Sequence, residues 1–250
     1  MPLQDQSPES RAVATSQSYL EQLSPQITHA GRTNAYGVGF ESPANTFDYI
    51  VLKRVFDIGM VLVFSPFLLS IGTIVALLVV LSSPGPIFFS HRRIRRGGAF
   101  FSMWKFRTMC QNSAEVLERH LALHPEDREE WLLNHKLKKD PRITGIGNIL
   151  RRSSLDELPQ VWNVLTGRMS LVGPRPIVAA EVEKYGSDFA YYIAVKPGVT
   201  GLWQSSGRST LTYDERVALD RKYVENWSLW LDVKILVRTV RCVVNSNGAF

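Results

Sequence analysis

The sequence predicts a mainly α-helical protein with one small β-hairpin, and part of the chain is expected to enter a membrane. Three features predict this fold class: a long uncharged run from Ile58 to Leu81, an aromatic and basic segment around Gly97–Gly98, and helical patterns downstream. The 250 residues, 45% of them hydrophobic, are enough to bury a core. The net charge of +6 favours anionic partners, namely phospholipid headgroups, phosphorylated substrates or nucleic acid.

The two cysteines, Cys110 and Cys242, belong to no CxxC pattern and to no Cys/His cluster. This excludes a disulfide scaffold and a structural zinc site, and it fits a reducing compartment. The sequence also contains no GxxxxGK[ST] and no HExxH motif, which argues against P-loop nucleotide hydrolases and zinc peptidases.

Residues 1–47 are rich in polar residues, proline and glycine, and their apolar residues show no period. This composition predicts a disordered N-terminal tail, which is slightly acidic. No apolar region follows a basic start, so the tail is not expected to be a secretory signal.

The run from Ile58 to Leu81 has 24 residues without charge, and 16 of them are Leu, Ile, Val or Phe. A straight helix of this length measures roughly 36 Å, which is enough to cross a hydrocarbon core of about 30 Å. Ser65–Pro66 interrupts the run, and basic residues flank it on both sides, whereas a single span has its positive loop on the cytoplasmic side. The residues alone leave two alternatives open: a spanning helix, or a re-entrant helix that bends at Pro66 and returns to the same face.

The segment "IFFSHRRIRRGGAFFSMWKFRTM" alternates aromatic and basic residues around Gly97–Gly98. It predicts a β-hairpin that lies along a headgroup layer. Single-stranded nucleic acid is bound by similar mixtures, but the membrane run immediately upstream argues against a nucleic-acid partner.

Residues 111–139 predict a solvated helical pair that is broken near Pro125. Its histidines match no metal-ligand spacing. Near the C-terminus, a helix is predicted with Trp227, Trp230, Leu231 and Val237 opposite a basic strip with Lys234, Arg238 and Arg241. Such a helix either lies in a membrane interface or packs on the core.

The chemistry is expected in "RRSSLDELPQ", where two carboxylates, Asp156 and Glu157, are adjacent. A helix is predicted from near Asp156 to about Leu165, with Gly167 as its C-terminal stop. Adjacent side chains on a helix point about 100° apart, so the two carboxylates need different roles. One alternative is purely structural: Asp156 caps the helix, or Ser154 caps it with Glu157 as its capping-box partner.

The other alternative is catalytic. The helix N-terminus and the pair Arg151/Arg152 form a positive environment that keeps Asp156 ionised and attracts phosphate, as an attacking carboxylate requires. Glu157 would then hold Mg²⁺, which prefers one or two carboxylates together with phosphates and water. In "VGPRP", Arg175 is presented between two prolines for phosphate contact. Together with the cations of "KPGVTGLWQSSGR", these residues suggest a diphosphate substrate.

Five motifs follow one another along the chain: "KRVFDIG", "WKFRTM", "RRSSLDELPQVWNVLTGRMSLVGPRP", "KPGVTGLWQSSGR" and "ALDRKYV". With these motifs in this order, the chain resembles bacterial sugar transferases, the monotopic polyprenyl-phosphate phosphoglycosyl transferases. The resemblance is to their exopolysaccharide-initiating branch and extends from about Leu52 to Val244, in its minimal catalytic form.

The resemblance implies a two-step exchange on Asp156, with Glu157 as the residue that binds the cofactor Mg²⁺. Asp156 attacks the sugar-linked phosphorus of a UDP-sugar, UMP leaves, and undecaprenyl phosphate then accepts the phosphosugar, with a plain hexose favoured. It also implies that the break at Ser65–Pro66 is that of a re-entrant helix, which makes the chain a monotopic membrane protein with interfacial amphipathic helices. By position, five residues match motif residues linked to substrate binding or site integrity: Lys105, Arg151, Arg175, Arg208 and Asp220.

The expected organisation is a tail over 1–47, a re-entrant membrane helix over 48–90 and a catalytic domain over 91–250, at the cytoplasmic face of the bacterial inner membrane. The expected partners are a UDP-sugar, undecaprenyl phosphate and membrane phospholipid, with a homodimer and downstream glycosyltransferases left open. Two rival functions are a conventional glycosyltransferase that releases UDP and a non-catalytic membrane scaffold.

Overall fold

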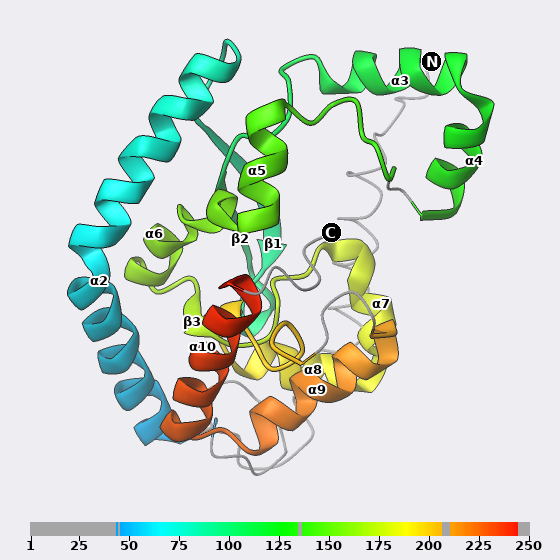
Figure 1. Cartoon of the computed structure of the whole chain (residues 1–250). Helices are drawn as coiled ribbons and strands as arrows, with labels where there is room; N and C mark the ends of the chain where they lie inside the picture. The colour runs from blue at the N-terminus through cyan, green and yellow to red at the C-terminus, as the bar shows by residue number, and fades with distance from the viewer. Residues whose placement is uncertain (1–43, 45, 135–136, 207–210, 245–250) are drawn as a thin grey trace, which may run out of the picture. The chain divides into compact units, whose positions relative to one another are not determined.

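The computed structural model describes residues 44, 46–134, 137–206 and 211–244 (Figure 1). The predicted tail therefore lies almost entirely outside the described residues. The described chain forms two compact units. Unit 1 contains the residues up to Phe64, then Ser90–Met103, and the chain from Gln160 onward; unit 2 contains Ser65–Phe89 and Trp104–Pro159.

The fold is mainly helical with a small two-stranded hairpin, as the sequence predicts. Its α-helices are α2 (Phe47–Ser82), α3 (Ser113–Leu123), α4 (Pro125–Asn134), α5 (Gly145–Ser153), α6 (Gln160–Leu165), α7 (Val182–Tyr185), α8 (Phe189–Ala194), α9 (Tyr213–Glu225) and α10 (Leu229–Val244). Its strands are β1 (Phe88–Ile94), β2 (Phe100–Phe106), β3 (Ser170–Val172) and β4 (Gly198–Thr200), and short 3-10 turns include η2 (Arg96–Gly98) and η3 (Leu155–Glu157).

The apolar run lies in helix α2, which begins at Phe47, close to the predicted start at residue 48, and is continuous through Pro66 to Ser82. Among the described residues it is the one helix long and apolar enough to cross a membrane, by length and composition, and only 11% of its apolar window is buried. The boundary between the two units falls inside it, between Phe64 and Ser65, next to the proline. The helix therefore contributes one half to each unit.

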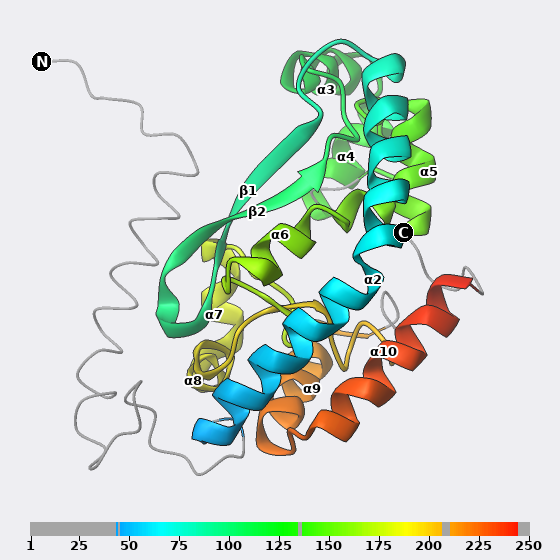
Figure 2. The ribbon, with the colours of Figure 1, turned by 90° about the vertical axis from the view of Figure 1, so that its left-hand side faces the viewer.

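The hairpin is formed by β1 and β2, which run side by side in Figure 2. The turn η2 joins them, and Gly97 and Gly98 have φ angles of 75° and 78°. These left-handed backbone conformations strain residues with a Cβ atom, which explains why two glycines stand at the tip.

Unit 1 has its largest core where the first half of α2 packs with β3, α9 and α10. Tyr49 of α2 meets Trp227 edge to face, with ring centroids 4.6 Å apart. The strands β3 and β4 pair in parallel, with Ser170 opposite Gly198 and Val172 opposite Thr200. The sequence did not predict this pairing, because strands of three residues show too little alternation to be recognised.

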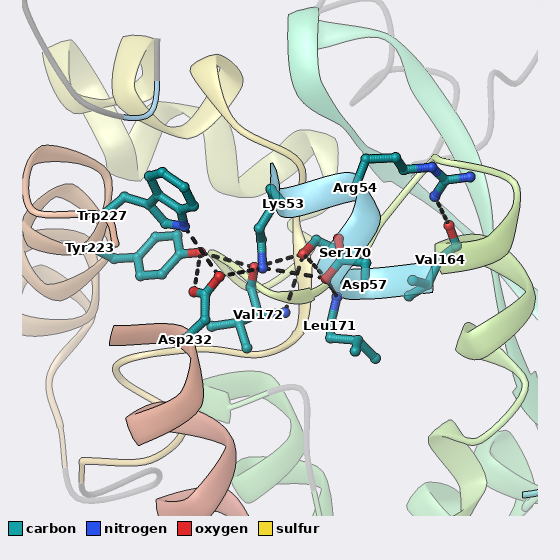
Figure 3. A network of polar contacts seen from close by, with 10 residues as sticks. All are labelled: Lys53, Arg54, Asp57, Val164, Ser170, Leu171, Val172, Tyr223, Trp227 and Asp232. Carbon is teal, nitrogen blue, oxygen red and sulfur yellow. Dashed lines mark hydrogen bonds and ion pairs between the residues drawn. The ribbon is translucent and has the colours of Figure 1, made fainter. Parts of the chain in front are cut away.

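A buried polar network crosses this core (Figure 3). The ammonium of Lys53 on α2 lies 3.4 Å from an Asp57 oxygen and 2.8 Å from an Asp232 oxygen of α10. Asp57 also accepts hydrogen bonds from the Ser170 hydroxyl and the Leu171 amide, at 3.0 and 3.2 Å. The three charged side chains are at most 3% exposed. The network therefore joins α2 to both β3 and α10.

Helix α10 packs on the core through Ile235 and Asp232, which are both fully buried. Its inner face therefore follows the predicted alternative of a helix packed on the core. The predicted separation of aromatic and basic faces is wrong. Trp227 precedes the helix and is buried, whereas Trp230 is 65% exposed and Lys234 lies over its ring, 5.3 Å from the centroid. Residues four apart share one helix face, so this tryptophan and this lysine point to the same side.

Unit 2 is built on the second half of α2, which packs with α5 (Figure 2). Val75 and Val79 of α2 pack with Phe106 and Leu150 in one apolar cluster. The predicted helical pair is confirmed as α3 and α4, which are interrupted just before Pro125.

Candidate active site

Asp156 and Glu157 lie in unit 2, in the 3-10 turn η3 between α5 and α6. The single helix predicted from Asp156 to Leu165 is wrong. Helix α5 ends at Ser153, the next residue Ser154 has a left-handed φ of 57°, and α6 begins only at Gln160, after Pro159. Ser154 makes no side-chain capping bond, so the predicted capping box is wrong as well. Gly167, with φ of 73°, follows α6 as predicted.

The position of this turn is fixed from both sides. Upstream, the Thr144 hydroxyl accepts a hydrogen bond from the Gly147 amide at 2.9 Å and caps α5 at its N-terminus. Gly147 itself lies so close to the Thr108 carbonyl that a Cβ atom there would be 2.1 Å from that oxygen. Leu155 and Leu158, on either side of the carboxylates, pack against the cluster around Leu150. The apolar neighbours anchor the turn while Asp156 and Glu157 face the polar side.

Both carboxylates meet the ammonium of Lys105, which comes from strand β2. The Lys105 Nζ lies 2.7 Å from Glu157 Oε1 and 3.3 Å from Asp156 Oδ2. The expectation that the two side chains diverge is therefore wrong, because the longer glutamate side chain reaches the same cation. Lys105 was predicted to contact substrate. Its contact with the carboxylate pair is an additional finding, because residues separated by 51 and 52 positions give no sign of contact in the sequence.

The pKa of Asp156 is raised above its ordinary value of 3.8, first because the side chain is buried and then because Glu157 is close. Lys105, by charge and hydrogen bond, and Arg151, by charge, act in the lowering direction. The sequence predicted a purely cationic environment that keeps this carboxyl acidic, and it missed the burial. A buried carboxylate with few solvating partners is a stronger nucleophile than a hydrated one, while the two cations favour its charged form.

Arg151 is held on α5 by a hydrogen bond from its Nε to the Thr108 hydroxyl, at 2.9 Å. Burial lowers its pKa, and the charges of Asp156 and Asp140 oppose that shift. Thr108 was not predicted as a site residue, although it stands in the motif "WKFRTM" three residues after Lys105. Unit 2 thus brings together four predicted residues, namely Lys105, Arg151, Asp156 and Glu157.

The carboxylate pair fits Mg²⁺ by its donor type. Two adjacent carboxylates, partly exposed at Glu157, match an ion that takes its other ligands from phosphates and water. Across the described part of the chain, no group of three or more His, Cys, Asp or Glu side chains could form a complete protein cage for an ion. A cage is not what a magnesium ion bound through substrate phosphates requires.

The remaining predicted residues belong to unit 1 or lie outside the description. Arg208 falls on residues 207–210, which the structure does not describe. Arg175 lies over the Trp203 ring, with its Cζ atom 5.9 Å from the ring centroid, and Arg216 lies over the same ring at 4.8 Å. Asp220 of α9 is only 2% exposed and accepts a hydrogen bond from the Tyr185 hydroxyl at 2.8 Å. Their roles toward substrate stay predictions.

Asp220 is expected to make unit 1 less stable as the pH rises. Burial raises the pKa of Asp220 from 3.8 to about 7, and its second oxygen is buried with no hydrogen-bond partner among the described residues. A folded-state pKa above the unfolded value means that the native state holds the proton more tightly. The stabilisation is therefore complete below pH 3.8 and is lost as the pH approaches about 7.

Thermal unfolding at pH 5 and pH 8 tests this prediction, with the melting temperature expected to fall at the higher pH. The variant Asp220→Asn keeps an oxygen that accepts the Tyr185 hydrogen bond, but its amide does not titrate. Its melting temperature should therefore depend less on pH. Asp214→Asn, at an exposed position of the same helix, serves as the control and should retain the wild-type slope. Equal slopes for all three proteins would contradict the prediction.

The chain is similar to known proteins over most of its length. The family model for bacterial sugar transferases matches residues 48–246. A UDP-galactose-lipid carrier transferase of Erwinia amylovora is 49% identical over 199 residues, and an undecaprenyl-phosphate galactose phosphotransferase of Salmonella typhimurium is 49% identical over 203 residues. Each alignment covers 80% of this chain but only 42% of the relative, so the chain spans less than half the length of these two proteins.

A third relative, the exopolysaccharide production protein ExoY of Rhizobium meliloti, is 45% identical over 202 residues, which are 79% of this chain and 88% of the relative. The range that the family model matches contains the carboxylate pair, Lys105 and Arg151. The chain belongs to the bacterial sugar transferase family.

Proposed function

We propose that this protein transfers a hexose-1-phosphate from a UDP-sugar to undecaprenyl phosphate and thereby initiates exopolysaccharide synthesis. The observation that carries the proposal is the buried Asp156 carboxylate beside Lys105 and Glu157. The names of the relatives support the substrate classes, since they specify a lipid carrier, undecaprenyl phosphate, galactose and exopolysaccharide.

In the first step, an Asp156 oxygen attacks the phosphorus that bears the sugar. A bond forms between this oxygen and phosphorus, the bond from phosphorus to the bridging oxygen breaks, and UMP leaves with that oxygen. In the second step, a phosphate oxygen of the lipid attacks the same phosphorus and releases the Asp156 carboxylate. Each step exchanges one acyl-phosphate or phosphoanhydride bond for another, so no other energy source enters the balance.

The residues around Asp156 have separate roles in this scheme. Lys105 and Arg151 oppose the rise that burial causes in the pKa of Asp156, and they thereby favour its charged, nucleophilic form. Glu157 would hold the magnesium ion, whose chemistry is to neutralise negative charge on the phosphate oxygens. Thr108 orients Arg151 through its hydroxyl.

The proposed location is the bacterial inner membrane, with the site at its cytoplasmic face. A soluble nucleotide and a lipid phosphate at headgroup depth meet there without either one crossing the bilayer. Helix α2 is proposed to be re-entrant, with Pro66 at the point where it turns back; its exposed apolar side chains support an environment of lipid.

A re-entrant α2 makes a specific topological prediction. Tags at the two ends of the chain are both expected in the cytoplasm, because the helix returns to the face that it enters. To locate each end, a single cysteine is introduced there on a background without Cys110 and Cys242. Its labelling by an impermeant thiol reagent in intact cells then shows on which side of the inner membrane that end lies. Labelling of the N-terminal position from outside the inner membrane would establish a spanning helix instead.

The nucleotide product tests the function itself. Membranes that contain the protein, incubated with undecaprenyl phosphate and a panel of UDP-sugars, are expected to release UMP with one hexose donor. Release of UDP would identify a conventional glycosyltransferase. The absence of any nucleotide release across the panel, from protein that folds normally, would favour a membrane scaffold.

A further inference from the structure

Unit 1 contains a hollow of about 460 Å³ at the end of α6, beside the hairpin. Arg95, from the hairpin turn, and Arg168, which follows α6, line it together with Ser102, Thr166 and Gly167. Its wall is a fixed structure, because the Asn163 side-chain amide of α6 donates a hydrogen bond to the Ser102 carbonyl of β2 at 2.8 Å. The lining of the hollow therefore includes two arginines on a defined frame.

Two further cations reach the same wall at Gly167. A Cβ atom placed on Gly167 would lie 3.7 Å from the Lys196 ammonium and 3.8 Å from the Arg54 guanidinium carbon. Gly167 also lines the hollow, so it adjoins both the hollow, with its two arginines, and this second pair of cations.

None of these four cations, within the described ranges, forms an ion pair with a carboxylate. Arg54 is held in place by hydrogen bonds to the carbonyls of Val164 and Leu165 at the end of α6, at 2.5 and 2.6 Å (Figure 3 shows the first). Burial, followed by repulsion from Arg54, lowers the pKa of Lys196. An anion in the hollow would relieve this repulsion, and arginine binds phosphate oxygens in bidentate fashion.

The surroundings of Arg54 indicate a lipid as the source of the anion. Arg54 lies on α2, and the apolar side chains of Val55, Leu62 and Val63 farther along this half of the helix are 61% to 72% exposed. On α6, Trp162 is 59% exposed, and its carbonyl accepts a hydrogen bond from the Thr166 hydroxyl that lines the hollow. Cations that adjoin exposed apolar and tryptophan side chains are typical of headgroup depth.

We propose that Arg54, Arg95, Arg168 and Lys196 form a binding site for the phosphate of an anionic glycerophospholipid. The acyl chains would lie along the exposed apolar side chains of α2. None of the four residues belongs to the carboxylate site, so this lipid is a structural ligand of unit 1 rather than the acceptor substrate. Such a ligand stabilises the native chain by an amount that grows with the logarithm of its concentration once that concentration exceeds the dissociation constant.

Native mass spectrometry of the full chain in detergent micelles doped with phosphatidylglycerol tests the site. The wild-type protein is expected to retain one phosphatidylglycerol per chain. Arg95→Gln/Arg168→Gln is expected to reduce the retained fraction at least fivefold, because it removes the two exposed cations that line the hollow. Arg238→Gln/Arg241→Gln, which removes the same charge from exposed positions of α10, is the matched control and should retain the lipid.

Equal lipid retention by both double variants overturns the proposal, since the lipid would then bind outside the hollow. An equal loss in both variants also overturns it, since total charge would then govern binding. Displacement of the lipid by millimolar inorganic phosphate would assign the hollow to free phosphate and would overturn the lipid source. UMP release is measured in parallel, with a short-chain polyprenyl phosphate as acceptor. Loss of phosphatidylglycerol from a double variant that still releases UMP supports this site. Because lipid retention is measured without any transferase reaction, this proposal can fail or hold independently of the proposed function.

Discussion

Asp156→Asn is expected to abolish transfer, with UMP release reduced by at least about a thousandfold. The amide has the size of the carboxylate, but it cannot attack phosphorus and leave again as a stable anion. Lys105 keeps its shorter contact, 2.7 Å to Glu157, so the turn η3 should remain folded. The loss would therefore report on the missing nucleophile rather than on a collapsed site.

Intact-protein mass spectrometry is the decisive measurement for this variant. Wild-type protein given the UDP-sugar without lipid acceptor should gain the mass of one hexose phosphate, located by digestion on the peptide that contains Asp156. Asp156→Asn should gain none. Glu157→Gln should lose nearly all turnover, whereas Glu118→Gln, at an exposed position of α3, should match the wild type. An adduct on any other residue, or full activity in Asp156→Asn, would remove the basis of the mechanism.

Lys53→Met is expected to destabilise the protein by about 3–5 kcal/mol, because it leaves two buried carboxylates without their shared cation. Asp232 is the critical partner. Burial raises its pKa, and Lys53 is the main group that opposes this effect. Without the lysine, Asp232 must either remain charged in the core or take up a proton, and both reduce stability at neutral pH.

Thermal unfolding in detergent measures this effect against Lys234→Met, which makes the same chemical change at an exposed position of α10. The double variant Lys53→Met/Asp232→Asn should recover part of the loss, since it removes one of the orphaned charges. A Lys53→Met protein that melts with the wild type would show that the network contributes no net stability. A double variant less stable than Lys53→Met would show that the loss has another cause.

The elements that the sequence predicted are those set by local signals. An uncharged run marks α2, two glycines mark the hairpin tip, and Pro125 marks the interruption between α3 and α4. Each depends on residues that are close in sequence, where composition and periodicity are informative.

The elements that it missed depend on partners far away in the chain. The first half of α2 carries Lys53, whose buried partner Asp232 lies on α10, and periodicity cannot reveal a partner so far away in the chain. Strands β3 and β4 pair across more than twenty residues. The chemical identity of the site was readable from the adjacent carboxylates, whereas their common cation and the burial of Asp156 follow only from the fold.

The link between α2 and α10 has a consequence for biosynthesis. Asp57 leaves the ribosome 175 residues before Asp232 (232 − 57), an interval on the order of ten seconds or more at the usual rate of translation. Throughout that time Lys53 and Asp57 have only each other as counter-charges, while the apolar stretch behind them is already available to the bilayer. Delivery of the nascent polypeptide to lipid and completion of its unit 1 core are therefore separate events, and the second awaits the last helix to be made.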